Sequence, residues 1–378
     1  MTSQPTHSQP ANGVLPRIEA LDGLRAISIL IVLFGHGAHT TGAPRLLRPM
    51  LNMGIVGVDL FFVISGFIIT QLLLRERRGG SISLASFWLR RALRILPPFA
   101  AACGGLALAA TAGLMNWSWP SFFGAVTFTK NTPLFGGDWF FGHFWSLSVE
   151  EQFYLLWPLL FMLAAPLTAS TQAVSAVLLA SPVLAWMCAR YWQPLQNVLP
   201  FIPYLAVGCL LSLRRWRSRT FPPDSSRRTR LLRLAAVVPL GFGCAYLKGE
   251  HRWVALTIPA EAVLLPLCAF MLVDECVRPD GLLKGLLTVA ALRWLGAVSY
   301  SLYLWQQLFL GPEDAYTGPW FWNRWPQNLL AALASGVLAH LLVERPCVRL
   351  KQRWTRSRRP APGIRPEPLL QDPVRGNL

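Results

Sequence analysis

The sequence predicts an all-α protein, a polytopic membrane helix bundle of about ten transmembrane helices. Hydrophobic residues make up 53% of its 378 residues, and charged residues make up only 14%. Apolar stretches long enough to cross a bilayer recur along the whole chain. Basic residues gather in alternate connections between these stretches, which is the pattern of a multi-pass membrane protein.

The expected organisation is one membrane domain with a short segment at each end. Residues 1–16 are expected to be disordered, residues 17–350 to form the membrane domain, and residues 351–378 to form a basic, Pro-rich cytoplasmic tail. The ten expected spans lie near residues 21–40, 55–75, 95–115, 145–165, 172–189, 197–213, 231–247, 253–273, 289–311 and 327–343.

The distribution of basic residues predicts the orientation of the chain. With the N-terminus placed inside, 28 of the 35 lysines and arginines fall on the inner side and seven on the outer side. This asymmetry places both termini in the cytoplasm. It also accounts for the net charge of +17, so the expected partner is the lipid bilayer and not nucleic acid. The seven cysteines show no CxxC spacing, so neither a disulfide framework nor a metal site is expected.

The first apolar segment carries an arginine and a histidine on one helical face. Arg25 and His36 are eleven residues apart, which places them on the same side of an α-helix about 16 Å from each other. Ionisable groups within a bilayer usually face the interior of a bundle or a water-filled cavity. The alternative is a packed, satisfied histidine and an arginine at the lipid headgroups.

Four titratable residues are expected at one depth near the outer surface. His36, Asp59, Glu150 and Glu151 each lie within about one and a half helical turns of the outer end of their spans. A histidine oriented by a carboxylate is a competent general base, so His36 with Asp59 or Glu150 is the candidate catalytic group. The alternative is chance placement near the interface.

The cytoplasmic side presents a cluster of arginines at the start of the third span. Arg90, Arg91 and Arg94 fall on adjoining faces of a helix that serines can cap, and they could grip a polyphosphate. Arg25 lies at a similar depth, so the four arginines could share one cytosolic ligand. The alternative is a set of topology anchors that touch anionic lipid.

Two outer connections, 116–144 and 312–326, are rich in tryptophan and phenylalanine. Such residues are most often the interfacial aromatic belt of a membrane protein. They can also stack on sugar rings, and we regard Trp139 and Trp145 as candidate substrate-binding residues.

Six segments of the chain resemble, in order, the signature segments of the acyltransferase-3 family of bacterial integral membrane O-acyltransferases. Each segment is short and apolar, but their order from Arg17 to Pro346 is specific. They are RIEALDGLRAISILIVLFGHG, GIVGVDLFFVISGFIIT, FWLRRALRILPP, HFWSLSVEEQFYLLWPLL, LGAVSYSLYLW and VERP.

The resemblance implies roles for particular residues. The family's Arg/Lys-x10-His motif falls on Arg25 and His36, and His36 corresponds to the residue regarded as catalytic. The basic segment associated with acyl-CoA falls on Arg90, Arg91 and Arg94, and the acidic positions fall on Asp59 and Glu150.

The segment SYSLYLW supplies a further match and a departure. Tyr303 matches it as a substrate-binding candidate, whereas Gln306 stands where many members have a histidine. Some members complete transfer with an appended extracytoplasmic esterase-like domain. None is evident in this sequence, so transfer is expected to finish within the membrane domain or on a separate partner.

The expected activity is transfer of an acyl group, most often acetyl, from cytosolic acetyl-CoA or another acyl-CoA to a carbohydrate hydroxyl. The expected location is the bacterial cytoplasmic membrane. An acyl-histidine intermediate is the main mechanistic variant. Polysaccharide, lipid-linked glycan, peptidoglycan and a macrolide-like molecule all fit as acceptor. The rival classes are a proton-coupled transporter or glycan exporter, which does not account for the arginines, and a nonenzymatic scaffold, which accounts for neither cluster.

Overall fold

The structure is a computed structural model that describes residues 18–51, 53–135, 137–163, 171–177, 180, 199–218, 226–249, 254–318 and 321–350. Within these ranges the chain forms helices and no strand. Residues 1–17 and 351–378, which include the two expected terminal segments, lie outside the described part.

The long helices coincide with nine of the ten expected apolar segments, and the remaining one, 172–189, lies largely outside the described residues. They are α1 (Glu19–Gly37), α2 (Gly54–Arg78), α3 (Leu84–Thr111), α6 (Phe144–Leu163), α8 (Ile202–Ser218), α9 (Arg227–Gly249), α10 (Val254–Val277), α12 (Ala290–Trp305) and α13 (Gln327–Ala339). The short helices are α4 (Trp119–Val126), α5 (Trp139–Gly142) and α11 (Lys284–Leu287), and the 3-10 turns are Arg45–Met50, Leu199–Phe201, Gln306–Leu308, Glu313–Ala315 and Phe321–Asn323.

Four of the described helical segments are long and apolar enough to cross a membrane. These are α1, α2, α3 and the segment Gln327–Leu350, which begins with α13. They support the expectation of an all-helical membrane protein. The full count of ten spans and the cytoplasmic position of both termini stay predictions.

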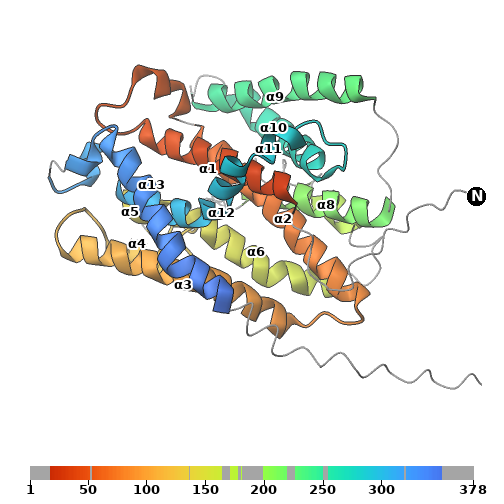
Figure 1. Cartoon of the computed structure of the whole chain (residues 1–378), viewed down its shortest axis with the longest axis horizontal. Coiled ribbons are helices and arrows are strands. Elements are labelled where there is room, and N and C mark those ends of the chain that lie inside the picture. The colour runs from red at the N-terminus through yellow and green to blue at the C-terminus, as the bar shows by residue number, and fades with distance from the viewer. Residues whose placement is uncertain are drawn as a thin grey trace, which may run out of the picture.

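Helix α1 is packed through the middle of the bundle between α2 and α12 (Figure 1). Small residues permit this packing because they let two backbones approach closely. A Cβ added at Gly296 of α12 would lie 1.8 Å from the backbone oxygen of Asp22, and one added at Gly35 would lie 2.7 Å from the backbone of Gly54. These contacts hold α1 in a fixed position relative to its neighbours, and α1 carries both Arg25 and His36.

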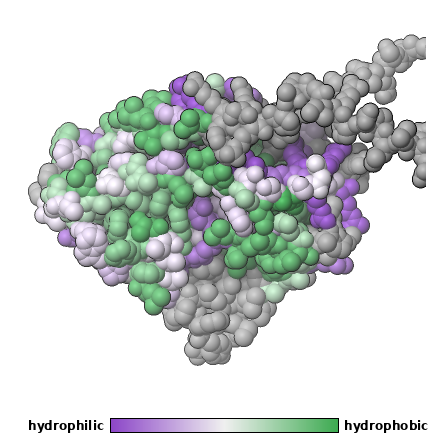
Figure 2. Space-filling model, turned by 90° about the horizontal axis from the view of Figure 1, so that it is seen from below, coloured by the Kyte–Doolittle hydropathy of each residue, from purple (hydrophilic) through white to green (hydrophobic). Residues whose placement is uncertain are grey.

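One face of the bundle is largely hydrophobic, as Figure 2 shows. Helix α6 exposes a run of leucines whose side chains face away from the core, namely Leu155, Leu156, Leu159, Leu160 and Leu163. Soluble proteins rarely expose contiguous apolar patches of this kind, so the surface is suited to lipid.

The predicted start of the third span is confirmed in its main features. The side chain of Ser83 caps α3 by accepting a hydrogen bond from the backbone N–H of Ser86. Helix α3 then runs without a break through Pro97 and Pro98 to Thr111. The arginine cluster therefore lies within about the first three turns of a helix that is long and apolar enough to cross a membrane.

The closing VERP segment is tied to α12 at a π-helical turn, His340–Glu344, that follows α13. Glu344 is buried and accepts hydrogen bonds from the hydroxyl of Ser301, at 2.6 Å, and from Nδ1 of His340, at 2.9 Å. The carboxylate therefore has partners on both helices and fixes the last span against α12.

A buried ion pair organises the outer connection between α4 and α5. Nζ of Lys130 lies 3.6 Å from Oδ1 of Asp138, and Asp138 also accepts hydrogen bonds from Ser118 and Ser121. Burial lowers the pKa of Lys130, and the Asp138 carboxylate opposes that shift. The pair joins α4 to the start of α5, which carries Trp139.

Replacing Asp138 by asparagine is expected to destabilise this connection by about 3 kcal/mol, the lower end for a broken buried ion pair, because Asp138 is partly exposed. Thermal unfolding of the purified protein in detergent measures the change. Asp314→Asn is the matched control, since Asp314 is exposed in the other outer connection. An equal loss in both variants would contradict a structural role for the pair.

Cysteine labelling tests the orientation of the bundle. In a background without native cysteines, an impermeant reagent applied from outside should modify Leu134→Cys and Phe321→Cys, which replace exposed side chains of the two outer connections. Arg228→Cys should react only after the membrane is opened, because the basic residues there place it inside. Reaction of Arg228→Cys in intact cells would overturn the topology.

Candidate active site

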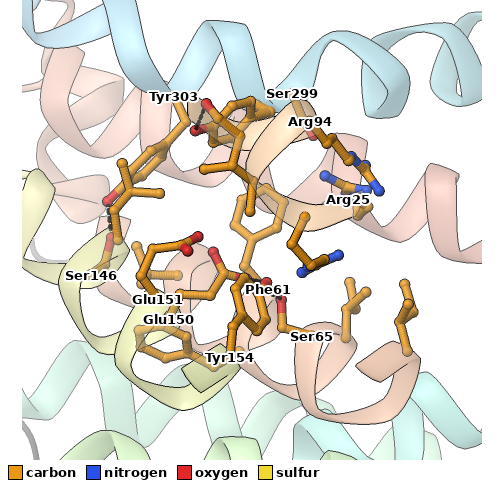
Figure 3. A pocket seen from close by; sticks show the side chains of 18 residues that line it. Arg25, Phe61, Ser65, Arg94, Ser146, Glu150, Glu151, Tyr154, Ser299 and Tyr303 are labelled. Carbon is orange, nitrogen blue, oxygen red and sulfur yellow. Dashed lines mark hydrogen bonds between the residues drawn. The ribbon is translucent and has the colours of Figure 1, made fainter. Parts of the chain in front are cut away.

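A polar cavity of about 90 Å³ lies among α1, α2, α3, α6 and α12 (Figure 3). Its walls combine apolar side chains with charged groups that are unusual inside a membrane bundle. The polar lining residues are Arg25, Ser65, Arg91, Arg94, Ser146, Glu150, Glu151, Tyr154, Ser299, Tyr300 and Tyr303.

Three guanidinium groups stand on one side of this cavity. Arg25 comes from α1 and Arg91 and Arg94 come from α3, and none of them forms an ion pair with a described residue. The guanidinium carbon of Arg91 lies 3.9 Å from the centre of the Tyr154 ring. The Nε atoms of Arg25 and Arg91 are buried and have no hydrogen-bond partner in the described part of the chain. The cavity is therefore suited to an anionic ligand.

Arg90 does not share this position. It forms an ion pair with Glu76 near the end of α2 and does not line the cavity. Of the three arginines expected to share one ligand, only Arg91 and Arg94 line the cavity, and ligand binding by them stays a prediction. The reason that Arg90 lies outside the cavity is helical geometry, because it lies one residue before Arg91 and faces the neighbouring helix α2.

Two carboxylates of α6 face the arginines across the cavity (Figure 3). Glu150 accepts hydrogen bonds from the hydroxyls of Ser65 and Tyr154. Glu151 has a buried Oε1 without a hydrogen-bond partner among the described residues. Three basic and two acidic side chains thus line one cavity.

Tyr303 and Ser146 line the end of the cavity nearest to His143. Their hydroxyl oxygens lie 2.5 Å apart, as the dashed line in Figure 3 shows. The Tyr303 hydroxyl also donates to the backbone oxygen of His143 at 2.9 Å. Tyr303 therefore stands between the charged cavity and the layer of side chains that contains His36.

His36 lies near the outer end of α1 and is half-buried. Its Nδ1 is 2.8 Å from Oε1 of Gln306. The ring of Trp139 meets His36 edge-on, with 5.6 Å between ring centroids, and makes a similar contact with His39. The histidine is thus held from two sides and still has part of its surface exposed.

The structure does not place the expected carboxylates beside His36. Gly57 packs on the backbone of Ser28, eight residues from His36, so Asp59 lies more than two helical turns, about 12 Å or more, below His36 along α1. His143 contacts Gln307, which adjoins Gln306, the partner of His36, so His143 lies at about the depth of His36. Glu150 lies seven residues, or about two helical turns, below His143. The estimate of depth failed because α5 and the start of α6 already lie within the bundle.

The two candidate tryptophans have different surroundings. Trp139 contacts the ring of His36 edge-on, and its role as a substrate-binding residue stays a prediction. Trp145 packs on Phe201 with 4.4 Å between ring centroids and meets Phe62, a fully buried side chain, at 6.2 Å. Trp145 is therefore a packing residue of the core, and the expectation that it stacks on a substrate has no support in its contacts.

The sequence reasoning did not select His143, Gln307 or Tyr154. His143 opens the segment HFWSLSVEEQFY, and its Nδ1 contacts Oε1 of Gln307. Tyr154 follows Glu150 by four residues, a spacing that places two helical side chains on one face and could have indicated the contact. Gln306 was visible only as a departure from the family pattern. In the described part of the chain no group of His, Cys, Asp and Glu could hold a metal.

These features define an all-helical membrane protein with a charged internal site and a histidine at the C-terminal end of α1. A family profile described as an acyltransferase domain, acyltransferase 3, matches residues 18–344. The chain therefore belongs to the acyltransferase-3 family, as the six sequence segments implied.

Several curated relatives align with most of this chain. YrhL of Bacillus subtilis, named provisionally as a peptidoglycan O-acetyltransferase, is 28% identical over 87% of this chain and 54% of its own length. The peptidoglycan O-acetyltransferase OatA of Listeria monocytogenes is 24% identical over 86% of the chain and 54% of its own length. The O-acetyltransferase OatA of Staphylococcus aureus is 26% identical, with coverages of 76% and 50%. The chain spans about half the length of these relatives, and no solved structure matches it.

Proposed function

We propose that this protein is a membrane O-acetyltransferase that moves an acetyl group from cytosolic acetyl-CoA to a hydroxyl of a cell-surface carbohydrate. The observation that carries the proposal is the cavity in which Arg25, Arg91 and Arg94 stand without ion-pair partners among the described residues. Family membership and relatives named as O-acetyltransferases support the same reaction class.

The arginines would hold the anionic part of the acyl donor. Guanidinium groups bind phosphate in a planar, bidentate manner, and Arg91 and Arg94 lie on the turns of α3 that we place at the cytosolic face. The arm that bears the thioester would then rise along α1 past Tyr303 toward His36. The contact between Tyr303 and Ser146 must open for it to pass.

His36 would act as general base on the acceptor. The acceptor hydroxyl attacks the thioester carbonyl while His36 takes its proton, a new C–O ester bond forms, and the C–S bond breaks. The thiolate then takes the proton from His36 and leaves as free coenzyme A, so that the enzyme returns to its starting state. An acyl group carried briefly on His36 is the variant of this route.

Peptidoglycan or another cell-surface glycan is the acceptor class that we favour. Two relatives are named for peptidoglycan, and Trp139 lies beside His36 where an aromatic ring can contact a sugar. A macrolide-like hydroxyl compound is the alternative acceptor. We place the protein in the bacterial cytoplasmic membrane as a ten-span protein with both termini inside.

Purified protein incubated with radiolabelled acetyl-CoA tests the proposal. Release of coenzyme A, as hydrolysis or as transfer to added glycan fragments, is the expected result. Proton flux through reconstituted vesicles without any thioester cleavage would instead show a transporter. Mass spectrometry of surface glycans from a deletion strain would then identify the acceptor by the loss of an ester.

A further inference from the structure

Helix α12 ends in two consecutive glutamines that each contact a histidine from another part of the chain. Gln306 contacts His36 of α1, and Gln307 contacts His143, which directly precedes α6. Both glutamines are almost fully buried, with 0% and 4% of their surface exposed. Gln307 also accepts a hydrogen bond from the backbone N–H of His143 at 3.0 Å.

The contact with Gln306 determines which nitrogen of His36 carries the proton. An amide oxygen can only accept a hydrogen bond, so Nδ1 of His36 must donate across the 2.8 Å distance. In a neutral imidazole the other nitrogen then has the free lone pair. Gln306 therefore directs Nε2 of His36 to act as the base.

The neutral amide differs in one respect from the carboxylate that orients many catalytic histidines. A carboxylate stabilises the imidazolium form, whereas an amide adds no charge. The titratable groups that face His36 are His39 in the following turn and His143 before α6, and both are basic. Within the described residues, no acid contacts His36, so this site favours a neutral histidine.

The nitrogen of the Gln306 side-chain amide, Nε2, is buried and forms no hydrogen bond with the described residues. A glutamine retained only for packing would normally have both ends satisfied. A free buried donor beside a half-buried histidine is placed to meet an oxygen atom of a bound ligand.

We propose that Gln306 is the positioning residue of His36, which fixes the Nδ1–H tautomer and leaves its own amide N–H for the acyl or acceptor oxygen. The claim that the Gln306 amide N–H meets a ligand oxygen rests on the proposed function. The claim that Gln306 fixes the tautomer of His36 does not. Gln306 thus performs in this chain the orienting task that Asp59 and Glu150 were expected to perform.

Nitrogen-15 NMR of protein with labelled histidines tests the tautomer without any activity. The signal of His36, identified by its loss in His36→Gln, should show a protonated Nδ1 and an unprotonated Nε2. In Gln306→Met, which keeps the length of the side chain but removes the acceptor, this preference should be lost. A wild-type His36 protonated at Nε2 would overturn the proposal even if Gln306→Met failed to fold.

Kinetics test the consequence for transfer. Gln306→Met should lower the rate about 10²-fold, the lower part of the range for a positioned base. Gln306→Glu should keep the tautomer but move the acid limb of the pH–rate profile upward by about one to three pH units, because a carboxylate stabilises imidazolium. Gln307→Met is the matched control, since it removes the amide that holds His143 and should leave the acid limb in place.

The outcomes distinguish failure of the positioning role of Gln306 from failure of the proposed function. An unchanged acid limb in Gln306→Glu, or an equal shift in Gln307→Glu, would overturn the positioning role of Gln306. If the wild-type protein cleaves no thioester at all, the proposed function fails, and the NMR measurement still decides the tautomer.

Discussion

Replacing His36 by alanine is expected to lower acyl transfer by about 10²- to 10⁴-fold, the contribution typical of a positioned general base. Binding of acyl-CoA should persist, because the arginines that we assign to the donor lie in the cavity beyond Tyr303. The measurements are release of coenzyme A and equilibrium binding of labelled acyl-CoA to the same preparation.

His39→Ala is the matched control for this change. His39 is an exposed histidine three residues away that also contacts Trp139, so its removal alters the same surface without removing the proposed base. Transfer should remain near the wild-type rate in this variant. A folded His36→Ala protein that binds donor and acylates at the native rate would leave His36 a packing residue.

The same mechanism predicts how the rate depends on pH. A general base acts only when it is unprotonated, so wild-type transfer should fall as the pH drops through the pKa of His36. The fall should be absent from the residual activity of His36→Ala. An acid limb that persists unchanged in that variant would assign the titration to another group.

Much of the fold could be predicted from the sequence, because the signal for a membrane helix is local. A run of apolar residues, its length and the charges at its ends lie within some twenty positions. The face shared by Arg25 and His36 was also predictable, since both residues lie on one continuous helix, Glu19–Gly37. The serine cap of α3 was visible for the same reason.

The partners of His36 could not be predicted, because they depend on how helices slide relative to one another. When depth is counted from the start of the apolar segment, Glu150 is expected beside His36. In the structure the short helix α5 already lies within the bundle, so Glu150 of α6 lies about two turns deeper than His36. The contact between His36 and Gln306 joins residues 270 positions apart. Nothing local in SYSLYLWQQ indicates which of its two glutamines meets which histidine.

The second large effect that we expect is on binding of the acyl-CoA donor. Arg91→Gln and Arg94→Gln are each expected to weaken acyl-CoA binding by about tenfold to a hundredfold, because a hydrogen bond to a charged group contributes about 1.5–3 kcal/mol. Both side chains line the cavity, and Nε of Arg91 is buried without a partner among the described residues. Equilibrium binding in a His36→Ala background measures the effect without turnover of the donor.

Arg90→Gln separates donor binding from anchoring in the membrane. Arg90 lies in the same basic segment but pairs with Glu76, and both side chains are partly exposed, so its loss should cost no more than about 1 kcal/mol of stability. Donor affinity should then be unchanged in Arg90→Gln and reduced in its two neighbours. If all three variants bind donor normally and only insert poorly, the arginines are lipid anchors. If all three weaken binding equally, the ligand contacts the whole basic segment, and the separation of Arg90 from the cavity is wrong.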